Sequence, residues 1–234
     1  MTTLSTRTVM TGIYLEQMAN AIPDDSLPEV WTSFELSRFS HGKHLFDYQQ
    51  KALQNASKVL WKYYEDFSDY HPRETGDANR WRKHLLWQWY QDNGLLEDFS
   101  IEPKSTFSDL LLEYHTGYAD AQTGRIAYEA FVNRMSFWMA TGSGKTLVIV
   151  KLIELLGRLV LAGEVPPCDI LFLTHRDDLI GQLKRHVEEF NTSHGDSRII
   201  LREMKEYAFS LLFWILTALK DASVWEFTGW TPAI

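Results

Sequence analysis

The stretch that decides the fold runs from Asn133 to Leu156 and reads NRMSFWMATGSGKTLVIVKLIELL. At its centre is a glycine-rich loop that ends in Lys145 and Thr146. The segment before the loop, RMSFWMA, is short and apolar, which favours a buried strand, and the segment after it has the periodicity of a helix that stops near Gly163. A glycine-rich loop between a strand and a helix is the context in which such loops bind phosphate groups.

The loop itself, residues 139–146, matches the pattern G-x-x-x-x-G-K-[ST] at its last three positions, with Met139 in place of the first glycine. Glycines at 142 and 144 let backbone N–H groups turn toward phosphate oxygens, and the start of the following helix adds partial positive charge. The Lys145 ammonium can reach the β- and γ-phosphates, and the Thr146 hydroxyl can ligate Mg²⁺. The residues predicted to bind a nucleotide are Thr141, Gly142, Ser143, Gly144, Lys145 and Thr146. The alternative is an ordinary strand-to-helix turn that binds no ligand.

The chain after the loop alternates strands and helices. CDILFLT (168–174) reads as a second buried strand, and RDDLIGQLKRHVEEF (176–190) reads as an amphipathic helix. Strand, loop, helix, strand and helix in this order predict a layered α/β domain with a parallel sheet, which we place at residues 131–234. The apolar run at 209–219 has 11 residues, too few to cross a bilayer.

The chain before the loop is predicted to be mostly helical over residues 1–130. LFDYQQKALQNASKVLWKYYEDF, starting at Leu45, has helical spacing, and RWRKHLLWQWYQDN predicts a second helix that Gly94 ends. Ser108 is a candidate N-cap for a third helix. Residues 57–130 therefore read as a helical, aromatic-rich insertion, whose rings suit a core better than base stacking, although stacking is physically possible.

Composition narrows the class of protein further. The chain has 234 residues and a net charge of −8, which argues against a strongly basic nucleic-acid coat but leaves room for a local basic cleft. The single cysteine, Cys168, excludes a disulfide within the chain and a Cys-rich metal site. The N-terminus lacks the apolar core of a signal peptide, so we expect a cytoplasmic protein with no membrane span.

Three blocks, taken in order, resemble superfamily-two DEAD/DEAH-like helicases, and most of all the Res subunits of type III restriction enzymes. LFDYQQKAL (45–53) is similar to the upstream glutamine motif, in which Gln49 would recognise adenine. MATGSGKT is the phosphate loop, and ILFLTHRDDLIGQLKRHVEEF (170–190) is similar to motif Ia. On a helix such as this one, Gln49 can also be an ordinary solvated residue.

The resemblance implies a RecA-like P-loop domain that uses ATP and Mg²⁺ and acts on DNA. In that family Lys145 and Thr146 would take part in catalysis, and Thr174 and Arg176 would contact the DNA backbone. A DNA methyltransferase subunit would be the partner in a type III system.

Two parts of the family pattern are missing. The D-E-x-x motif, which helps to hold Mg²⁺ and position water, has no match after Phe190, and no second RecA-like domain follows. We therefore expect an incomplete RecA-like domain, truncated or frame-shifted, that binds ATP with little or no hydrolysis. Two alternatives stay open: a nucleotide kinase or other P-loop enzyme, and a non-enzymatic remnant or interaction module.

Overall fold

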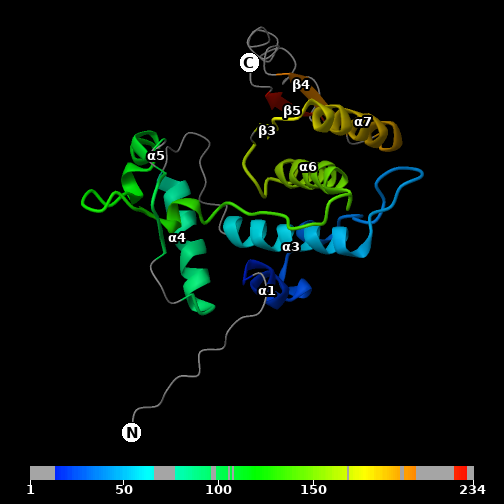
Figure 1. Cartoon of the computed structure of the whole chain (residues 1–234). Coiled ribbons are helices and arrows are strands. Elements are labelled where there is room, and N and C mark those ends of the chain that lie inside the picture. Colours follow the sequence, from blue (N-terminus) through cyan, green and yellow to red (C-terminus); the bar gives the residue numbers. More distant parts are fainter. Residues whose placement is uncertain are drawn as a thin grey trace. The chain divides into compact units, whose positions relative to one another are not determined.

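The computed structural model describes residues 14–65, 77–95, 99–104, 106, 108–167, 169–195, 198–203 and 224–230. These residues form two compact units (Figure 1). The first unit lies within 1–27, 58–65 and 73–136, and the second lies within 28–57, 66–72 and 137–234. The long helix α3 (Asp47–Tyr64) contributes its first part to the second unit and its last part to the first.

The first unit is mainly helical, with a small hairpin. Its helices are α1 (Tyr14–Ala21), η1 (Asp24–Ser26), α4 (Asp77–Asp92), α5 (Ser108–Tyr114), η3 (Thr116–Tyr118) and η4 (Tyr128–Phe131). The strands β1 (Ser100–Ile101) and β2 (Ile126–Ala127) pair antiparallel. Its core contains Met18, Leu86, Trp87, Tyr90 and Val132. The aromatic residues of α4 thus supply much of this core, as the sequence suggested.

The second unit combines helices with a three-stranded sheet. It contains α2 (Glu29–Thr32), α6 (Lys145–Leu161), α7 (Asp177–Ser193), β3 (Ile170–Leu173), β4 (Arg198–Glu203) and β5 (Val224–Trp230). The strand order is β3-β5-β4, and β5 runs parallel to both neighbours. Its core joins α6 and α7 to β4 through Val150, Ile153, Val187, Phe190 and Ile199. The mixed α/β character expected from the sequence is confirmed.

Most of the helices follow the sequence pattern. Helices over α3, α4, α6 and α7 were predicted and are confirmed. Helix α4 ends two residues before Gly94, whose φ of 102° suits only glycine. The third predicted helix is present, but Ser108 is its first residue and not its N-cap, and it ends at Tyr114, sooner than its pattern suggested.

The strand predicted immediately before the phosphate loop is wrong. Residues 134–140 form no strand, although their side chains alternate between the half-buried Met135, Phe137 and Met139 and the exposed residues between them. Phe137 and Met139 pack against the core of the second unit. The segment therefore buries one side as a strand would, but it joins no ladder, and hydrogen bonds to a neighbour are what define a strand.

Some expectations fall outside the described residues, namely those on Cys168 and on the apolar run at 209–219. Within the described part of the chain, every helix is too short or too polar to cross a membrane.

Candidate functional site

The phosphate loop is a tight turn that leads directly into α6. Gly142 and Gly144 have φ values of 80° and 76°, and Gly144 is the N-cap residue of α6. The Ser143 N–H donates to the Ala140 carbonyl at 3.2 Å, and the Leu147 N–H donates to the Gly144 carbonyl at 2.9 Å. Both glycines occupy the left-handed region that costs other residues about 1–2 kcal/mol. The loop conformation therefore depends on these two positions.

Gln49 lies against the phosphate loop, although 94 residues separate it from Ser143. Its Nε2 donates to the Ser143 carbonyl at 2.7 Å, and its Oε1 accepts from the Phe46 N–H at 2.8 Å. The second bond caps the start of α3, because a residue in the first turn reaches back to an N–H ahead of the helix. The side chain is only 1% exposed. Gln49 thus holds the loop and its own helix together.

Tyr48 is a second anchor of the same carbonyl. Its hydroxyl donates to the Ser143 carbonyl at 3.0 Å, and its ring stacks on Phe46 with centroids 5.7 Å apart. The glutamine motif indicates Gln49 but not Tyr48. The signal for Tyr48 was present in its position beside Gln49 at the start of a helix, but a tyrosine there has many other uses.

Space and donors for phosphate groups are present on the loop. A Cβ added to Gly142 would meet no atom within 4 Å, so the backbone there is open to a ligand. The Ser143 hydroxyl is buried without a hydrogen-bond partner among the described residues. The Lys145 ammonium folds back onto the Ala140 carbonyl at 2.8 Å. An exposed ammonium with a single neutral acceptor is available to an anion. Thr146 lies half-buried in the first turn of α6.

The residues expected to contact DNA lie at the carboxyl end of β3 and the start of α7. The Arg176 N–H donates to the Thr174 hydroxyl at 3.2 Å. The Arg176 guanidinium binds the Asp178 carboxylate with two nitrogens, and this pair raises the pKa of Arg176 and lowers the pKa of Asp178. In the described part of the chain, no hydrogen bond joins Thr174 or Arg176 to the phosphate loop. DNA binding by Arg176 would have to compete with Asp178.

The segment 28–46 is tied to the helices of the second unit. The Trp31 indole donates to the Glu164 carboxylate at 2.7 Å, beyond the end of α6. The Lys151 ammonium donates to the Glu35 carbonyl at 2.8 Å. The ring of Phe39 is fully buried beside Phe190 of α7. These contacts fix the chain that leads into Gln49.

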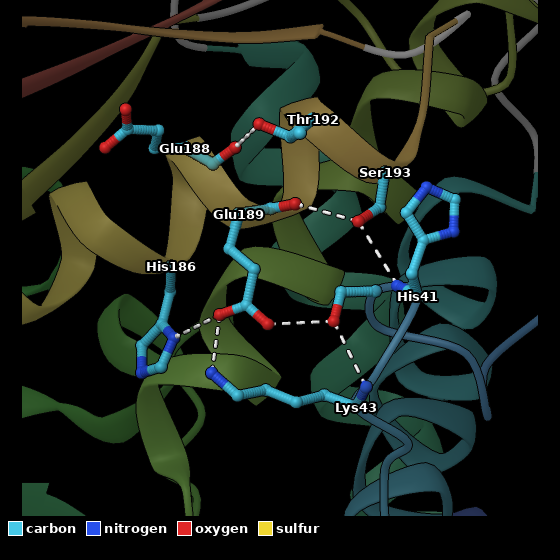
Figure 2. A network of polar contacts seen from close by, with 8 residues as sticks. His41, Lys43, His186, Glu188, Glu189, Thr192 and Ser193 are labelled. Atoms are coloured by element: carbon cyan, nitrogen blue, oxygen red, sulfur yellow. Dashed lines mark hydrogen bonds and ion pairs between the residues drawn. The ribbon is translucent and has the colours of Figure 1, made fainter.

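A polar network completes this attachment, and Figure 2 shows it around Glu189. The Glu189 carboxylate accepts a hydrogen bond from the Ser40 hydroxyl at 2.8 Å and pairs with the Lys43 ammonium. His186 Nδ1 lies 3.8 Å from the same carboxylate. We call Ser40, Lys43, His186 and Glu189 the Glu189 clamp. It links the residues ahead of the glutamine motif to the motif Ia helix.

Because of the Glu189 clamp, we expect the folded protein to lose stability in acid. Burial, followed by the charge of Lys43, lowers the pKa of His186. A histidine whose pKa is lowered on folding stabilises the protein above its unfolded pKa of about 6.5, and that stability is lost as the pH falls through the folded pKa. We expect the urea midpoint of unfolding to fall from pH 7 to pH 5, and His186→Gln to reduce this slope.

Glu189 affects the stability of the protein over a lower pH range than His186 does. Burial alone would raise the pKa of Glu189, but the hydrogen bonds from Lys43 and Ser40 outweigh it and lower the pKa. Its contribution is present above about 4.5 and disappears only at lower pH. Glu189→Gln should therefore flatten the profile below that pH and steepen the slope between pH 7 and pH 5, because the Glu189 carboxylate raises the pKa of His186. Equal profiles for the unmodified chain and His186→Gln would contradict this account of the clamp.

Comparison with known proteins agrees with the geometry. A family model described as "Type III restriction enzyme, res subunit" matches residues 42–209, well over half of the chain. The match includes Gln49, the phosphate loop, Thr174, Arg176 and most of the Glu189 clamp, and it leaves out the segment 28–41. Searches of curated proteins and of solved structures gave no significant match.

Proposed function

The chain belongs to the family of the Res subunits of type III restriction enzymes, whose members are helicase-like ATP-binding proteins, and from this premise we propose that it is the ATP-binding and DNA-contacting part of a restriction-type DNA helicase or translocase. The observation that carries the proposal is the contact between Gln49 and the Ser143 carbonyl. It joins the glutamine motif to the phosphate loop, as a shared nucleotide site requires.

The proposed nucleotide site is the loop from Thr141 to Thr146. The open backbone at Gly142 and the unpartnered hydroxyl of Ser143 fit a phosphate group, which needs several donors at close range. Lys145 would leave the Ala140 carbonyl and pair with the β- and γ-phosphates, and the Thr146 hydroxyl would hold Mg²⁺. When bound, ATP with Mg²⁺ would supply the phosphoryl group whose transfer drives a motor of this kind.

For the adenine ring we propose recognition by Gln49. Its amide has one N–H and one lone pair beyond those used by Ser143 and Phe46, which is the donor and acceptor pair that an adenine edge needs. The Gln49 side chain is buried in this structure, so a bound base would have to displace the atoms that bury it. Catalytic roles for Lys145 and Thr146 belong to the same proposal.

DNA contact is proposed at Thr174 and Arg176. Both lie where β3 ends and α7 begins, with the Thr174 hydroxyl and the Arg176 guanidinium as donors for backbone phosphates. Such contacts position a protein on DNA and carry no sequence information. A DNA methyltransferase subunit is proposed as the partner through the family alone.

The fold proposal follows from the same family. We propose that the second unit is a partial RecA-like P-loop domain built on the parallel strands β3, β5 and β4. In this reading the N-terminal region up to about residue 130, apart from the segment that carries Gln49, is an appended helical region, and the ATP-binding domain continues from about residue 131.

Replacing Lys145 by alanine tests the proposed function. Because a hydrogen bond to a charged group is worth about 1.5–3 kcal/mol, we expect Mg-ATP affinity to fall about 10- to 100-fold. The measurement is titration calorimetry with Mg-ATP on the whole chain.

Lys104→Ala is the matched control, since Lys104 is also exposed but belongs to the first unit and not to the phosphate loop. This variant should bind Mg-ATP as the unmodified chain does. Equal affinity of Lys145→Ala and the unmodified chain would remove the phosphate loop from the nucleotide site. Loss of affinity in both lysine variants would mean that the effect is one of net charge.

A further inference from the structure

The first unit contains a groove that the proposed ATP site does not use. It lies between α4 and the turns around η3 and β2, and its volume is about 680 Å³. This volume falls within the range of about 300–1,000 Å³ that is usual for small-ligand pockets. The residues that matter for its chemistry are Arg80, Trp81, His84, Tyr118, Asp120 and Glu129. We call it the α4 groove.

An exposed indole forms one wall of the α4 groove. Trp81 is 55% exposed and leans against the His84 ring, with centroids 5.6 Å apart. Trp87 and Tyr90, on the same helix, are buried in the core of the unit. Trp81 therefore does not serve that core, and its ring face is available to a flat ligand. Base stacking on an aromatic side chain tolerates any base, because every base has a π-face.

Arg80 is the cation that lines the α4 groove, and Lys83 approaches the Tyr118 ring of the same groove. Arg80 lies over the Tyr118 ring at 5.3 Å and donates to the Gly117 carbonyl at 2.9 Å. Lys83 approaches the same ring at 5.4 Å and donates to the Ala130 carbonyl at 3.0 Å. Neither carbonyl neutralises a charge. Burial, and after it the charge of Arg134, lowers the pKa of Lys83, while the charge of Glu129 acts in the opposite direction.

The two carboxylates of the groove have partners of their own. Asp120 accepts the N–H groups of Gln122 and Thr123 in a turn. Glu129 lies 3.3 Å from His84 Nδ1, and its charge partly offsets that of Lys83. The lining of the groove thus holds one arginine, Arg80, and two carboxylates that are already engaged by other groups. The Arg80 guanidinium beside an exposed indole matches a nucleotide, which has a flat base and a charged phosphate.

We propose that the α4 groove binds single-stranded DNA, with one base stacked on Trp81 and the adjacent phosphate at Arg80. The proposal rests on the proposed function in one respect, the choice of DNA as the nucleic acid. A single strand fits better than a duplex, because the bases of a duplex are already stacked on one another and offer no free face to Trp81. Binding of this kind is independent of sequence and weakens with salt.

The test is fluorescence anisotropy of a labelled oligothymidylate of about 12 nucleotides, a length within the range of about 4–16 that a single OB fold binds. Trp81→Ala should bind the oligonucleotide about 10-fold more weakly than the unmodified chain does. Trp81→Phe should recover most of the lost affinity. Tyr114→Ala is the matched control, since Tyr114 is 78% exposed in the same unit but lies outside the groove. It should bind within twofold of the unmodified chain.

Three outcomes would overturn the proposal: no binding of the oligonucleotide, equal binding by Trp81→Ala and the unmodified chain, or tighter binding of a duplex of the same length. A fall in affinity for Tyr114→Ala as large as that for Trp81→Ala would also overturn it. Mg-ATP calorimetry on Trp81→Ala distinguishes the two sites. Normal ATP binding with weakened DNA binding supports the α4 groove, whereas loss of ATP binding in every variant, with Trp81-dependent DNA binding kept, would reject the ATP site alone.

Discussion

Lys151→Met is expected to lower the free energy of unfolding by about 3–5 kcal/mol, as the loss of one partner from a buried ion pair does. The Lys151 side chain is 3% exposed and that of Glu154 is 7% exposed, and their charged atoms lie 2.6 Å apart on α6. The same ammonium donates to the Glu35 carbonyl. The substitution leaves a buried carboxylate with Arg158 as a partial partner and a carbonyl without this donor. Urea unfolding followed by circular dichroism measures the change.

Lys184→Met is the control for this prediction. Lys184 pairs with Glu203 at 2.8 Å in the same unit, but both side chains are well exposed. Exposed pairs contribute about 0–1 kcal/mol, so this variant should unfold almost as the unmodified chain does. The double variant Lys151→Met/Glu154→Leu should recover much of the loss, because it removes both charges. If Lys151→Met and Lys184→Met proved equally mild, the attachment of residues 28–46 to α6 would be wrong.

Gly144→Ala is expected to cost about 2–4 kcal/mol of stability and to reduce Mg-ATP affinity at least about 10-fold, since a left-handed residue and a displaced hydrogen bond both contribute. A Cβ at this position would lie 2.6 Å from Gln49 Nε2, closer than any real contact. Gln49 must then move away from the Ser143 carbonyl and the Phe46 N–H. Urea unfolding and Mg-ATP calorimetry report the two effects.

Gly142→Ala separates backbone strain from the clash with Gln49. Its φ of 80° is close to that of Gly144, but its added Cβ would meet no atom within 4 Å. It should therefore cost only about 1–2 kcal/mol. In a Gln49→Ala background the cost of Gly144→Ala should fall toward the same value, because the clashing amide is gone. An unchanged cost in that background would mean that Gln49 does not support the loop.

The sequence predicted the parts of the site that depend on local pattern. The glycines, Lys145 and Thr146 form one continuous stretch, so their order alone indicates a loop followed by a helix. The apolar spacing of α3, α6 and α7 indicates amphipathic helices without any knowledge of their neighbours. The order of the three motifs then indicated a family in which the glutamine at this position lies near the phosphate loop.

The sequence could not predict contacts that depend on tertiary packing. Gln49 and Tyr48 both bind the Ser143 carbonyl across more than 90 residues of chain, and no local pattern encodes that pairing. The attachment of Trp31, Glu35 and Ser40 to α6 and α7 is similarly long-range. The segment before the loop was misassigned for a related reason. Its alternating burial resembles a strand, but a strand also needs a partner for its hydrogen bonds.

The rise in melting temperature of the unmodified chain with Mg-ATP tests the central claim most directly. A ligand at 100 times its dissociation constant stabilises the state that binds it by about 2.7 kcal/mol. For a chain of this length that corresponds to a rise of about 5–10 °C, with a much smaller rise for Lys145→Ala. A melting temperature that stays the same with and without Mg-ATP, in a chain that is folded by circular dichroism, would contradict the claim that this loop binds ATP.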